Sequence, residues 1–437
     1  MRRCRRPHRG GLLPVARLAL LALPLLGGCG DSAPPPEGPD SITLREGAPP
    51  PPLASCPAPV PAFDIDEVAV GLEVPWDLAL APDGRLFVTE RPGRIRVIEN
   101  GVLRETPWFE LEVEHSDEIG LLGMMLAPDF ALTGHIFVVS SHFRPEPLGG
   151  FPVLGWGLRR IRNRLPGDGG TSLITRVQRI TDHGGTGAGL TPWVDNIPAA
   201  IIHAGGALRP HPDGGMLLSL GDAMDPWSAQ DPESLRGSIL HIPSTSEPPP
   251  RLRLRPADHV VARGVRNSQG IGFLGADSSA VVFIDHGPSG LASEARRQAK
   301  DELNLLVPGD NYGWPVEAGR FPDSRYRQPV VEWTPAIAPG GMATLPGDGL
   351  GGDPNTTARV LVTGLRGETL VQVRMERVDA TSSWLPICQH RLLGDEWGRL
   401  RAVLAGADGA VYVSTSNRDG RGVPRPGDDR ILRLQWE

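Results

Sequence analysis

One histidine stands in an unusual setting, within the stretch "AAIIHAGGALRPHPDGGMLLSLGD" at residues 199–222. His203 follows an apolar run and precedes two glycines, Gly205 and Gly206. An imidazole titrates near neutral pH and can take a proton from a substrate hydroxyl. The flanking glycines strip the backbone of side chains at this point, which lets another group approach it closely. A solvated loop histidine would look the same, so His203 alone does not decide between the two.

Several arginines occupy similarly specialised positions. "RGVRNSQGIGF" holds Arg266 and Asn267, and "WGRLRAV" holds Arg399 and Arg401. Because side chains alternate along a strand, Arg399 and Arg401 are predicted to share one face. Guanidinium groups suit bidentate pairing with carboxylates. Each arginine, taken singly, could equally be solvated or paired with a surface acid.

Two neighbouring segments offer oxygen atoms. "IDHGPSG" places Gly287 and Pro288 directly after a strand pattern, and "KDELN" supplies Asp301 and Glu302. Gly-Pro is a common turn, and two acids can simply solubilise a loop.

The elements that must position these groups recur along the chain. Asp-Gly turns followed by apolar strands begin at Ala81, His211 and Gly406, and looser copies begin at Ala127, Gly275 and Ala358. Short strands with regular turn signals and abundant glycine predict an all-β fold. Six units over this length favour a six-bladed β-propeller, in which radial repetition hides strand edges. Two β-domains in series are the alternative, but no linker separates them between Ile65 and Glu437.

Together the motifs resemble the glucose/sorbosone dehydrogenase family, which includes soluble quinoprotein glucose dehydrogenase and aldose sugar dehydrogenases. The segments that carry the resemblance occur in the family's order over about residues 67–434: "VPWDLALAPDGRLFVTERPGRIRVI", "GLLGMMLAPDF", "HAGG", "GVRNSQG", "HGP", "DELN", "NYGWP" and "PAIAPGGM". The family is a six-bladed propeller, in agreement with the repeat count.

The resemblance implies the cofactor pyrroloquinoline quinone (PQQ), a planar orthoquinone with three carboxylates. Motif matching implies that Arg266 and Asn267 contact the quinone and its substrate, and that Arg399 and Arg401 pair with cofactor carboxylates. Arg366 falls where a family lysine often sits. The exchange keeps the charge, in a chain whose only lysine is Lys300.

The resemblance also implies Ca²⁺, held by the carbonyls of Gly287 and Pro288 with Glu302 as a nearby acidic candidate, and it allows a second, structural calcium. His203 matches the family's general base, and its flanking glycines would let the backbone approach a flat cofactor or a sugar ring closely. The implied reaction oxidises an aldose at its anomeric carbon to a lactone and passes electrons to an external acceptor, a cytochrome or a quinone.

Some positions depart from the family pattern. Ala204 and Ala207 replace bulkier and basic residues around His203, and Ala336 and Gly340 lack the usual hydroxyls. Ser238 and His241 stand where Lys and Arg are usual, and an insertion, "SGLASEARRQAK", precedes "DELN". These departures motivate an alternative, a lipid-anchored propeller that binds a carbohydrate or protein without catalysis. A calcium-dependent lactonase on the same architecture is a third reading.

The N-terminus predicts export. A basic start, a short apolar run and the lipobox-like "LGGC" indicate a lipoprotein signal peptide over residues 1–28, with lipidation at Cys29. Proline-rich residues 29–63 are expected to form a disordered tether before the propeller of residues 64–437. The expected location is that of an exported bacterial lipoprotein, periplasmic or outer-membrane-associated, attached to the membrane only through its lipid.

The net charge bears on possible binding partners, and the cysteines bear on a possible disulfide. Without residues 1–28 the chain has 38 basic and 51 acidic residues, a balance that argues against nucleic acid. Export permits a disulfide between Cys56 and Cys388, although two separate buried thiols remain an alternative.

Overall fold

The structure is a computed structural model that describes residues 53–144, 173–243, 252, 254–289, 299–321, 324–378, 383–406 and 408–436. The predicted signal peptide, Cys29 and the proline-rich residues up to 52 lie outside the described residues, as does most of the insertion before "DELN". Within the described part of the chain, no helix is long and apolar enough to cross a membrane.

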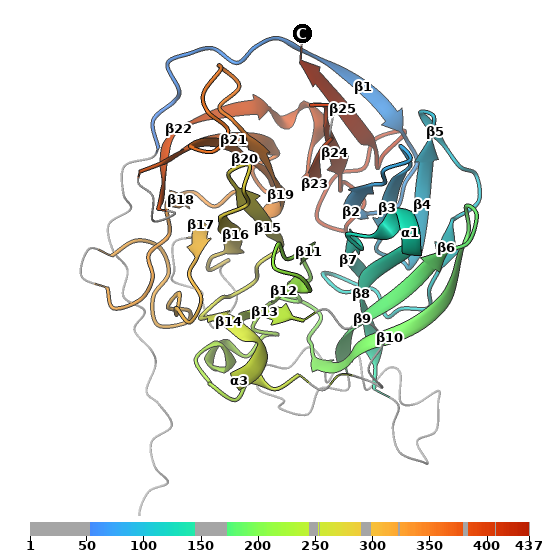
Figure 1. Cartoon of the computed structure of the whole chain (residues 1–437), viewed down its shortest axis with the longest axis horizontal. Helices are drawn as coiled ribbons and strands as arrows, with labels where there is room; N and C mark the ends of the chain where they lie inside the picture. The colour runs from blue at the N-terminus through green and yellow to red at the C-terminus, as the bar shows by residue number, and fades with distance from the viewer. Residues whose placement is uncertain are drawn as a thin grey trace, which may run out of the picture. The chain divides into compact units, whose positions relative to one another are not determined.

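The described residues form six antiparallel sheets, the blades of a propeller (Figure 1). Blade one contains β2 (Pro75–Leu80), β3 (Leu86–Glu90), β4 (Arg94–Glu99) and β5 (Val102–Leu103), with β6 (Phe109–Glu110) also paired to β4. Blade two contains β7 (Leu121–Leu126), β8 (His135–Phe143), β9 (Leu173–Asp182) and β10 (Gly187–Pro198). Blade three contains β11 (Leu208–Pro210), β12 (Met216–Leu220), β13 (Ser238–Ile242) and β14 (Val260–Arg263).

The remaining blades follow the same plan. Blade four contains β15 (Gly270–Leu274), β16 (Ala280–His286), β17 (Asp301–Leu306) and β18 (Val331–Trp333). Blade five contains β19 (Pro339–Pro346), β20 (Thr357–Gly364), β21 (Thr369–Arg377) and β22 (Trp384–Leu393). Blade six contains β23 (Leu400–Ala405), β24 (Val411–Thr415), β25 (Ile431–Trp436) and β1 (Phe63–Ala69). The described helices are short: α1 (Phe130–Thr133), η1 (Pro226–Ala229), α3 (Pro256–His259) and η3 (Asp395–Trp397).

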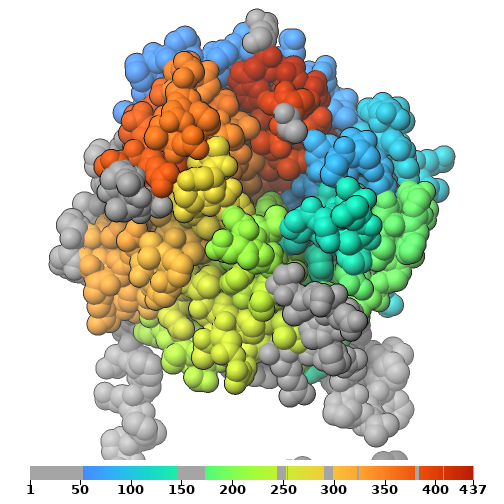
Figure 2. All heavy atoms as spheres, in the orientation of Figure 1, coloured from blue at the N-terminus to red at the C-terminus, as the bar shows by residue number. Residues whose placement is uncertain are grey.

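The ring closes through both ends of the described chain. β1, from the N-terminal side, pairs antiparallel with the C-terminal β25 and completes blade six. The first strand of each blade contacts the first strand of the next, and β2 contacts β23. The blades therefore succeed one another in chain order around the face in Figure 2. The predicted six-bladed propeller is confirmed.

The repeated turns explain why the blades resemble one another. In three copies the same pair of backbone hydrogen bonds closes the Asp-Gly turn, for example Ala81 N to Arg85 O and Gly84 N to Ala81 O. Five predicted copies lie between the first and second strands of a blade. The sixth, from Ala358, covers β20 and β21 instead, and the equivalent turn of blade five lies at residues 347–356.

Apolar seams between blades hold the ring together. The middle strands β3 and β12 are buried along their whole length, because a neighbouring blade covers each face. One such seam joins blades two and three through Leu122, Val177 and Leu218. Continuous apolar runs rather than strict alternation are the sequence signature of such strands.

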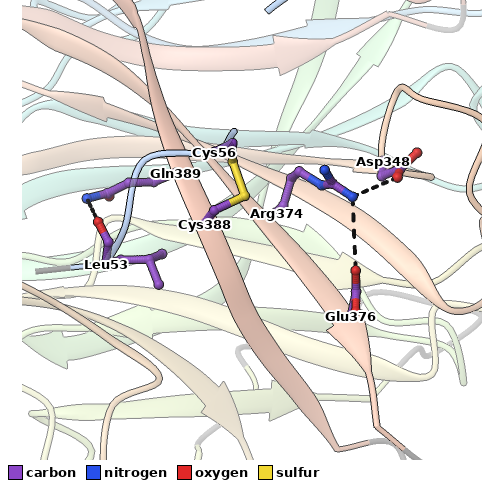
Figure 3. Close-up of a disulfide and its surroundings, with 7 residues drawn as sticks. All are labelled: Leu53, Cys56, Asp348, Arg374, Glu376, Cys388 and Gln389. Atoms are coloured by element: carbon purple, nitrogen blue, oxygen red, sulfur yellow. Dashed lines mark hydrogen bonds and ion pairs between the residues drawn. A yellow bond between two sulfur atoms is a disulfide. The ribbon is translucent and has the colours of Figure 1, made fainter. Parts of the chain in front are cut away.

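The end of the predicted tether is pinned to blade five. A disulfide joins Cys56 to Cys388 on β22 (Figure 3). Ser55 and Gln389 form a parallel bridge beside it, and the Gln389 side chain donates to the carbonyl of Leu53. Residues 53–62, here called the strap, thus lie along the outermost strand of blade five before the chain enters β1 of blade six.

Candidate active site

A cavity of about 210 Å³ collects most of the predicted site residues. They come from loops and strand ends of blades three to six, far apart in the sequence. The lining consists of Asp117, Glu118, His203, Arg266, Asn267, Gln269, His286, Ser289, Ala338, Leu365, Arg366, Arg399, Arg401, Asp419 and Arg421. Two imidazoles, five guanidinium groups and three carboxylates therefore face one space.

His203 is held by a buried carboxylate that the sequence analysis did not single out. Its Nδ1 lies 2.7 Å from Oδ1 of Asp222, whose Oδ2 accepts a hydrogen bond from the Trp314 indole. Burial opposes ionisation of Asp222, but the neighbouring His203 and its hydrogen bond keep the pKa of this carboxyl below its usual value. A carboxylate only accepts hydrogen bonds, so the proton is assigned to Nδ1 and the Nε2 lone pair is left free.

The backbone of His203 adopts a left-handed conformation, with φ of 57°. Such a conformation is costly for a residue with a side chain and is found where surrounding contacts enforce it. Glu118 accepts a hydrogen bond from the His203 N–H at 3.0 Å, and Asn267 donates to the same carboxylate oxygen at 3.0 Å. His203 is thus fixed by its neighbours, as expected of a functional residue.

The two glycines after His203 allow close packing against other parts of the protein and not against a ligand. A Cβ on Gly205 would lie 2.8 Å from backbone atoms of Ser219 and Gly221, and one on Gly206 would lie 3.0 Å from Leu122. Both glycines also have positive φ. The expectation that they face a cofactor or sugar is wrong: they allow the His203 loop to pack against β12 and β7.

Arg266 and Asn267 are rigidly held. Their backbone N–H groups donate to the two carboxylate oxygens of Asp285, at 2.9 and 2.7 Å. Arg266 donates to the hydroxyl of Ser289 at 2.7 Å and lies over the ring of Trp314. Both predicted residues are almost fully buried at the cavity wall, so no ordering of these side chains is needed when a ligand enters.

Arg399 and Arg401 do share one face, as the period of two predicts. Both reach Oδ2 of Asp419, Arg399 at 2.7 Å and Arg401 at 3.4 Å. Arg401 also lies 3.9 Å above the ring of Trp76. Burial lowers the pKa of Arg401 to about 10, which still leaves it charged at neutral pH. One carboxylate thus neutralises only half of this arginine pair.

Arg366 lies exposed at the cavity wall, and its guanidinium makes no hydrogen bond or ion pair within the described residues. Together with Arg399 and Arg401 it offers three guanidinium groups. Asp419 neutralises one of these three positive charges. This donor set fits a ligand with three carboxylates. The described residues are therefore compatible with PQQ.

The Gly287–Pro288 segment sits at the cavity edge, between the lining residues His286 and Ser289. A Cβ on Gly287 would lie only 1.4 Å from the carbonyl oxygen of Lys300, so no other residue fits there. No described donor bonds to the carbonyl oxygens of Gly287 and Pro288. These unsatisfied acceptors suit a hard cation.

The Glu302 carboxylate is not directed at the carbonyl oxygens of Gly287 and Pro288. Its carboxylate accepts hydrogen bonds from the Gly319 N–H at 2.7 Å and the Asn304 amide at 3.1 Å, and burial raises its pKa to about 6. Asp301 faces the Gly-Pro segment instead and accepts from the Gly287 N–H. Strand alternation lets only one of the two acids face that way. The prediction of Glu302 as a metal ligand is therefore not supported by its placement.

The departures from the family pattern largely avoid the cavity. Ala204 and Ala207 are buried in the apolar seams on either side of blade three. A Cβ on Gly340 would lie 3.0 Å from the backbone of Arg401, so the absence of a side chain permits a close approach of β19 to β23. Ser238 and His241 bond to backbone carbonyls of blade three and do not line the cavity.

Sequence reasoning also missed the ionisable lining residues Asp117, Glu118, His286, Asp419 and Arg421. Arg421 donates to Glu118 at 3.0 Å across blades two and six. Burial favours the neutral form of Glu118, but its interactions with His203 and Arg421 lower the pKa of this carboxyl to about 2. Burial lowers the pKa of His286 to about 3, so this imidazole is neutral. The acids directly before "GLLG" were the available signal for Glu118.

Within the described residues, no group of three or more His, Cys, Asp or Glu side chains is placed to hold a metal ion. The fold and the cavity define a propeller with an arginine-rich pocket and a carboxylate-held histidine. The sequence profile of the Glucose / Sorbosone dehydrogenase family matches residues 72–432, and the chain belongs to this family.

Relatives agree with this membership. The aldose sugar dehydrogenase YliI of Escherichia coli K12 is 26% identical over 370 residues, which cover 80% of this chain and 89% of the relative. The quinoprotein glucose dehydrogenase B of Acinetobacter calcoaceticus is 25% identical over 297 residues, covering 60% and 55%.

Solved structures are similar over the whole propeller. The PQQ-bound aldose sugar dehydrogenase of Streptomyces coelicolor superposes with a TM-score of 0.65 at 29% identity, covering 87% of this chain and 100% of that chain. An oxidoreductase from Thermus thermophilus, provisionally described as a glucose dehydrogenase, gives a TM-score of 0.69 at 36% identity, covering 86% and 100%.

Proposed function

We propose that this protein is a PQQ- and calcium-dependent dehydrogenase that oxidises aldoses at the anomeric carbon to lactones. The observation that carries the proposal is the His203–Asp222 pair, which opens onto a cavity with five guanidinium groups. The relatives named for PQQ and for aldose oxidation support it.

Arg366, Arg399 and Arg401 would hold the cofactor's carboxylates, and Arg266 and Asn267 would orient its quinone and the sugar. The carbonyls of Gly287 and Pro288 would hold Ca²⁺. Bound PQQ would supply an orthoquinone that accepts hydride from the anomeric carbon.

His203 would take the proton of the anomeric hydroxyl on Nε2. Asp222 keeps the ring in the required tautomer and, as a carboxylate 2.7 Å away, stabilises the imidazolium that forms. This division of labour resembles that of other base–carboxylate pairs, in which the acid orients the imidazole and remains ionised. The electrons removed from the sugar would finally reach an external acceptor, a cytochrome or a quinone.

The test is reconstitution of the purified protein with PQQ and Ca²⁺, followed by addition of aldoses and an artificial electron acceptor. Dye reduction should disappear in His203→Ala while PQQ still binds. His183→Ala, an exposed histidine in the β9–β10 turn, is the matched control and should keep full activity. Failure of PQQ to bind the wild type would refute the proposal and favour a non-catalytic binder. Lactone hydrolysis without quinone would favour the lactonase.

We also propose that the protein is exported and lipidated on Cys29, so that it works in the periplasm or at the outer membrane. The basic and apolar N-terminus with "LGGC" supports this proposal. Cys29→Ser should abolish incorporation of labelled fatty acid and release the protein from membranes. Equal membrane association of both proteins would contradict it.

A further inference from the structure

A second cavity, of about 180 Å³, lies outside the active site at the outer rim of the seam between blades five and six. Blade five supplies its polar wall: Arg359 on β20, Gln372 and Arg374 on β21, and His390 on β22. Trp436 of β25 lines it from blade six, and residues 58–61 of the strap line it as well. The Cys56–Cys388 disulfide fastens the strap beside it (Figure 3).

Strand register places the four polar side chains on one face of the sheet. Arg359 lies opposite Arg374, and Gln372 lies opposite His390. Directly opposed residues of antiparallel strands point to the same side, as do residues two apart on one strand. Leu361 and Leu370, further along this face, pack in the apolar seam against blade six. The seam therefore changes from apolar to strongly polar at the rim.

The donors in this cavity exceed the acceptors. Asp348 is already committed: one of its oxygens accepts from the backbone of Leu350 and Gly352, and the other from Arg374 at 2.8 Å. Among the described residues, the buried Nε of Arg374 has no hydrogen-bond partner. A buried donor left without a partner costs free energy, so native proteins rarely leave one without water or a ligand.

Arg374 has carboxylate partners in Asp348, at 2.8 Å, and Glu376, at 4.0 Å, whereas Arg359 is less compensated. Arg359 is half-buried, and burial lowers its pKa. Its one hydrogen bond within the described residues is a 3.3 Å contact from Nε to the carbonyl of Gly347, and no described carboxylate lies within ion-pair distance. Gly349 lacks a side chain where its Cβ would lie 3.0 Å from Nη1 of this guanidinium. The absence of a side chain at Gly349 thus leaves room beside the Arg359 guanidinium, with which no described carboxylate forms an ion pair.

We infer that this rim cavity binds a phosphate-type oxyanion between Arg359 and Arg374. Two guanidinium groups with free N–H donors are the usual partners of such anions. Given that one ordered water takes up about 30 Å³, the cavity has room for a tetrahedral oxyanion and a few waters. The anion could come from solution or from a lipid headgroup.

The test compares thermal unfolding of the full-length protein, Arg359→Gln and Arg374→Gln over a titration with inorganic phosphate. The wild type should show a saturable rise in Tm, and both variants should need at least tenfold more phosphate for the same rise. Arg255→Gln, an exposed arginine at the start of α3, is the matched control and should respond as the wild type does. Phosphate bound by the active-site arginines would raise the Tm of every protein equally, because these arginines are intact in all of them, so this effect drops out of the comparison.

A second readout separates ligand binding from a structural role. Without phosphate, Arg359→Gln should unfold at the same or a higher temperature than the wild type, because it removes an unneutralised charge from a confined site. A clearly lower Tm would assign Arg359 to the architecture and contradict the inference.

Cosedimentation with phosphatidylglycerol vesicles distinguishes the two sources. Vesicle binding that depends on Arg359, without a response to free phosphate, would identify a headgroup. A response to free phosphate that depends on Arg359 would identify a soluble anion. Absence of any Arg359-dependent effect in both assays would overturn the site.

Discussion

Asp222 Oδ1 lies 2.7 Å from His203 Nδ1, and this contact decides which histidine nitrogen is available as a base. The pair belongs to one blade: His203 precedes β11, and Asp222 lies two residues after the end of β12. The left-handed backbone of His203 and the burial of the Asp222 carboxylate each cost folding free energy, and the fold retains both to hold this geometry.

Asp222→Asn should lower kcat by about 10²–10⁴-fold, the range that a positioned general base contributes. The amide can present an N–H to Nδ1, which would favour the opposite tautomer and place the proton on Nε2. Steady-state kinetics and a PQQ titration measure the two effects separately, and PQQ affinity should change little.

Asp225→Asn provides the control, because Asp225 lies on the same loop but pairs with Arg236 at 36% side-chain exposure. Its kcat should match the wild type. An Asp222→Asn enzyme with normal kcat would show that Asp222 does not set the base.

Replacement of the arginines should weaken PQQ binding in a graded order. Arg401→Gln removes a buried cation, and charged hydrogen bonds contribute about 1.5–3 kcal/mol, so affinity should fall at least tenfold. Arg366→Gln should cost less, because the exposed Arg366 is screened by water. Absorbance titration of the apo protein with PQQ gives both constants; the reverse order would contradict the proposed carboxylate partners.

The propeller was predictable because its signals are local. Three Asp-Gly turns and three looser copies recur with apolar strands, and each Asp-Gly turn closes through its own backbone. The positions of Arg266, Arg399 and Arg401 were predictable from motifs and strand alternation. Asp222 was not singled out, although it ends the strand pattern after His203, because their contact depends on how the His203 loop, with its left-handed backbone, lies against β12.

Two other expectations are not supported by the placement of the residues, for physical reasons that the sequence does contain. Asp301 and Glu302 are adjacent on β17, so at most one of them could face the Gly-Pro segment. The glycine pair after His203 signals close approach correctly, but the approaching group is the backbone beside β12 and not a ligand. Which partner comes close depends on blade packing, which a single sequence does not specify.

The disulfide should stabilise the propeller without affecting catalysis. Cys56 and Cys388 are separated by 332 residues, and closing long loops gives the largest entropic effect on the unfolded chain, typically about 2–5 kcal/mol. Cys56→Ser/Cys388→Ser should therefore lower Tm, while kcat with PQQ stays unchanged at 25 °C. Loss of activity in the folded double variant would show that the strap also supports the active site.

Blade closure should depend on pH through Asp429. This carboxyl accepts N–H groups of Val74 and Asn417 and so joins blade one to blade six. Burial raises its pKa to about 6, so between about pH 4 and 6 the folded state holds a proton that the unfolded chain has lost. The stability from this group is present at acidic pH and is lost as pH rises through 6, by about 3 kcal/mol in total.

Asp429→Asn, which cannot titrate, should remove this component. The gap in unfolding free energy between wild type and variant should therefore be larger at pH 4 than at pH 7. Chemical denaturation at the two pH values measures the gap, and the subtraction cancels every other titrating group. A gap that is constant or larger at pH 7 would assign Asp429 an ordinary or lowered pKa.

Gly340→Ser tests whether the departures from the family pattern impair the site. Restoring the missing hydroxyl should harm rather than help, because the new Cβ would lie 3.0 Å from the Cα and carbonyl oxygen of Arg401. Forcing atoms into a packed contact typically costs about 1–3 kcal/mol, and a shift of β23 would move Arg401 away from its ligand. We expect a lower Tm and weaker PQQ binding.

Ala336→Ser, at a half-buried position of the same segment, is the control and should leave both the Tm and PQQ binding nearly unchanged. Tighter PQQ binding in Gly340→Ser would mean that the hydroxyl, and not the close approach of β19 to β23, is what this position needs.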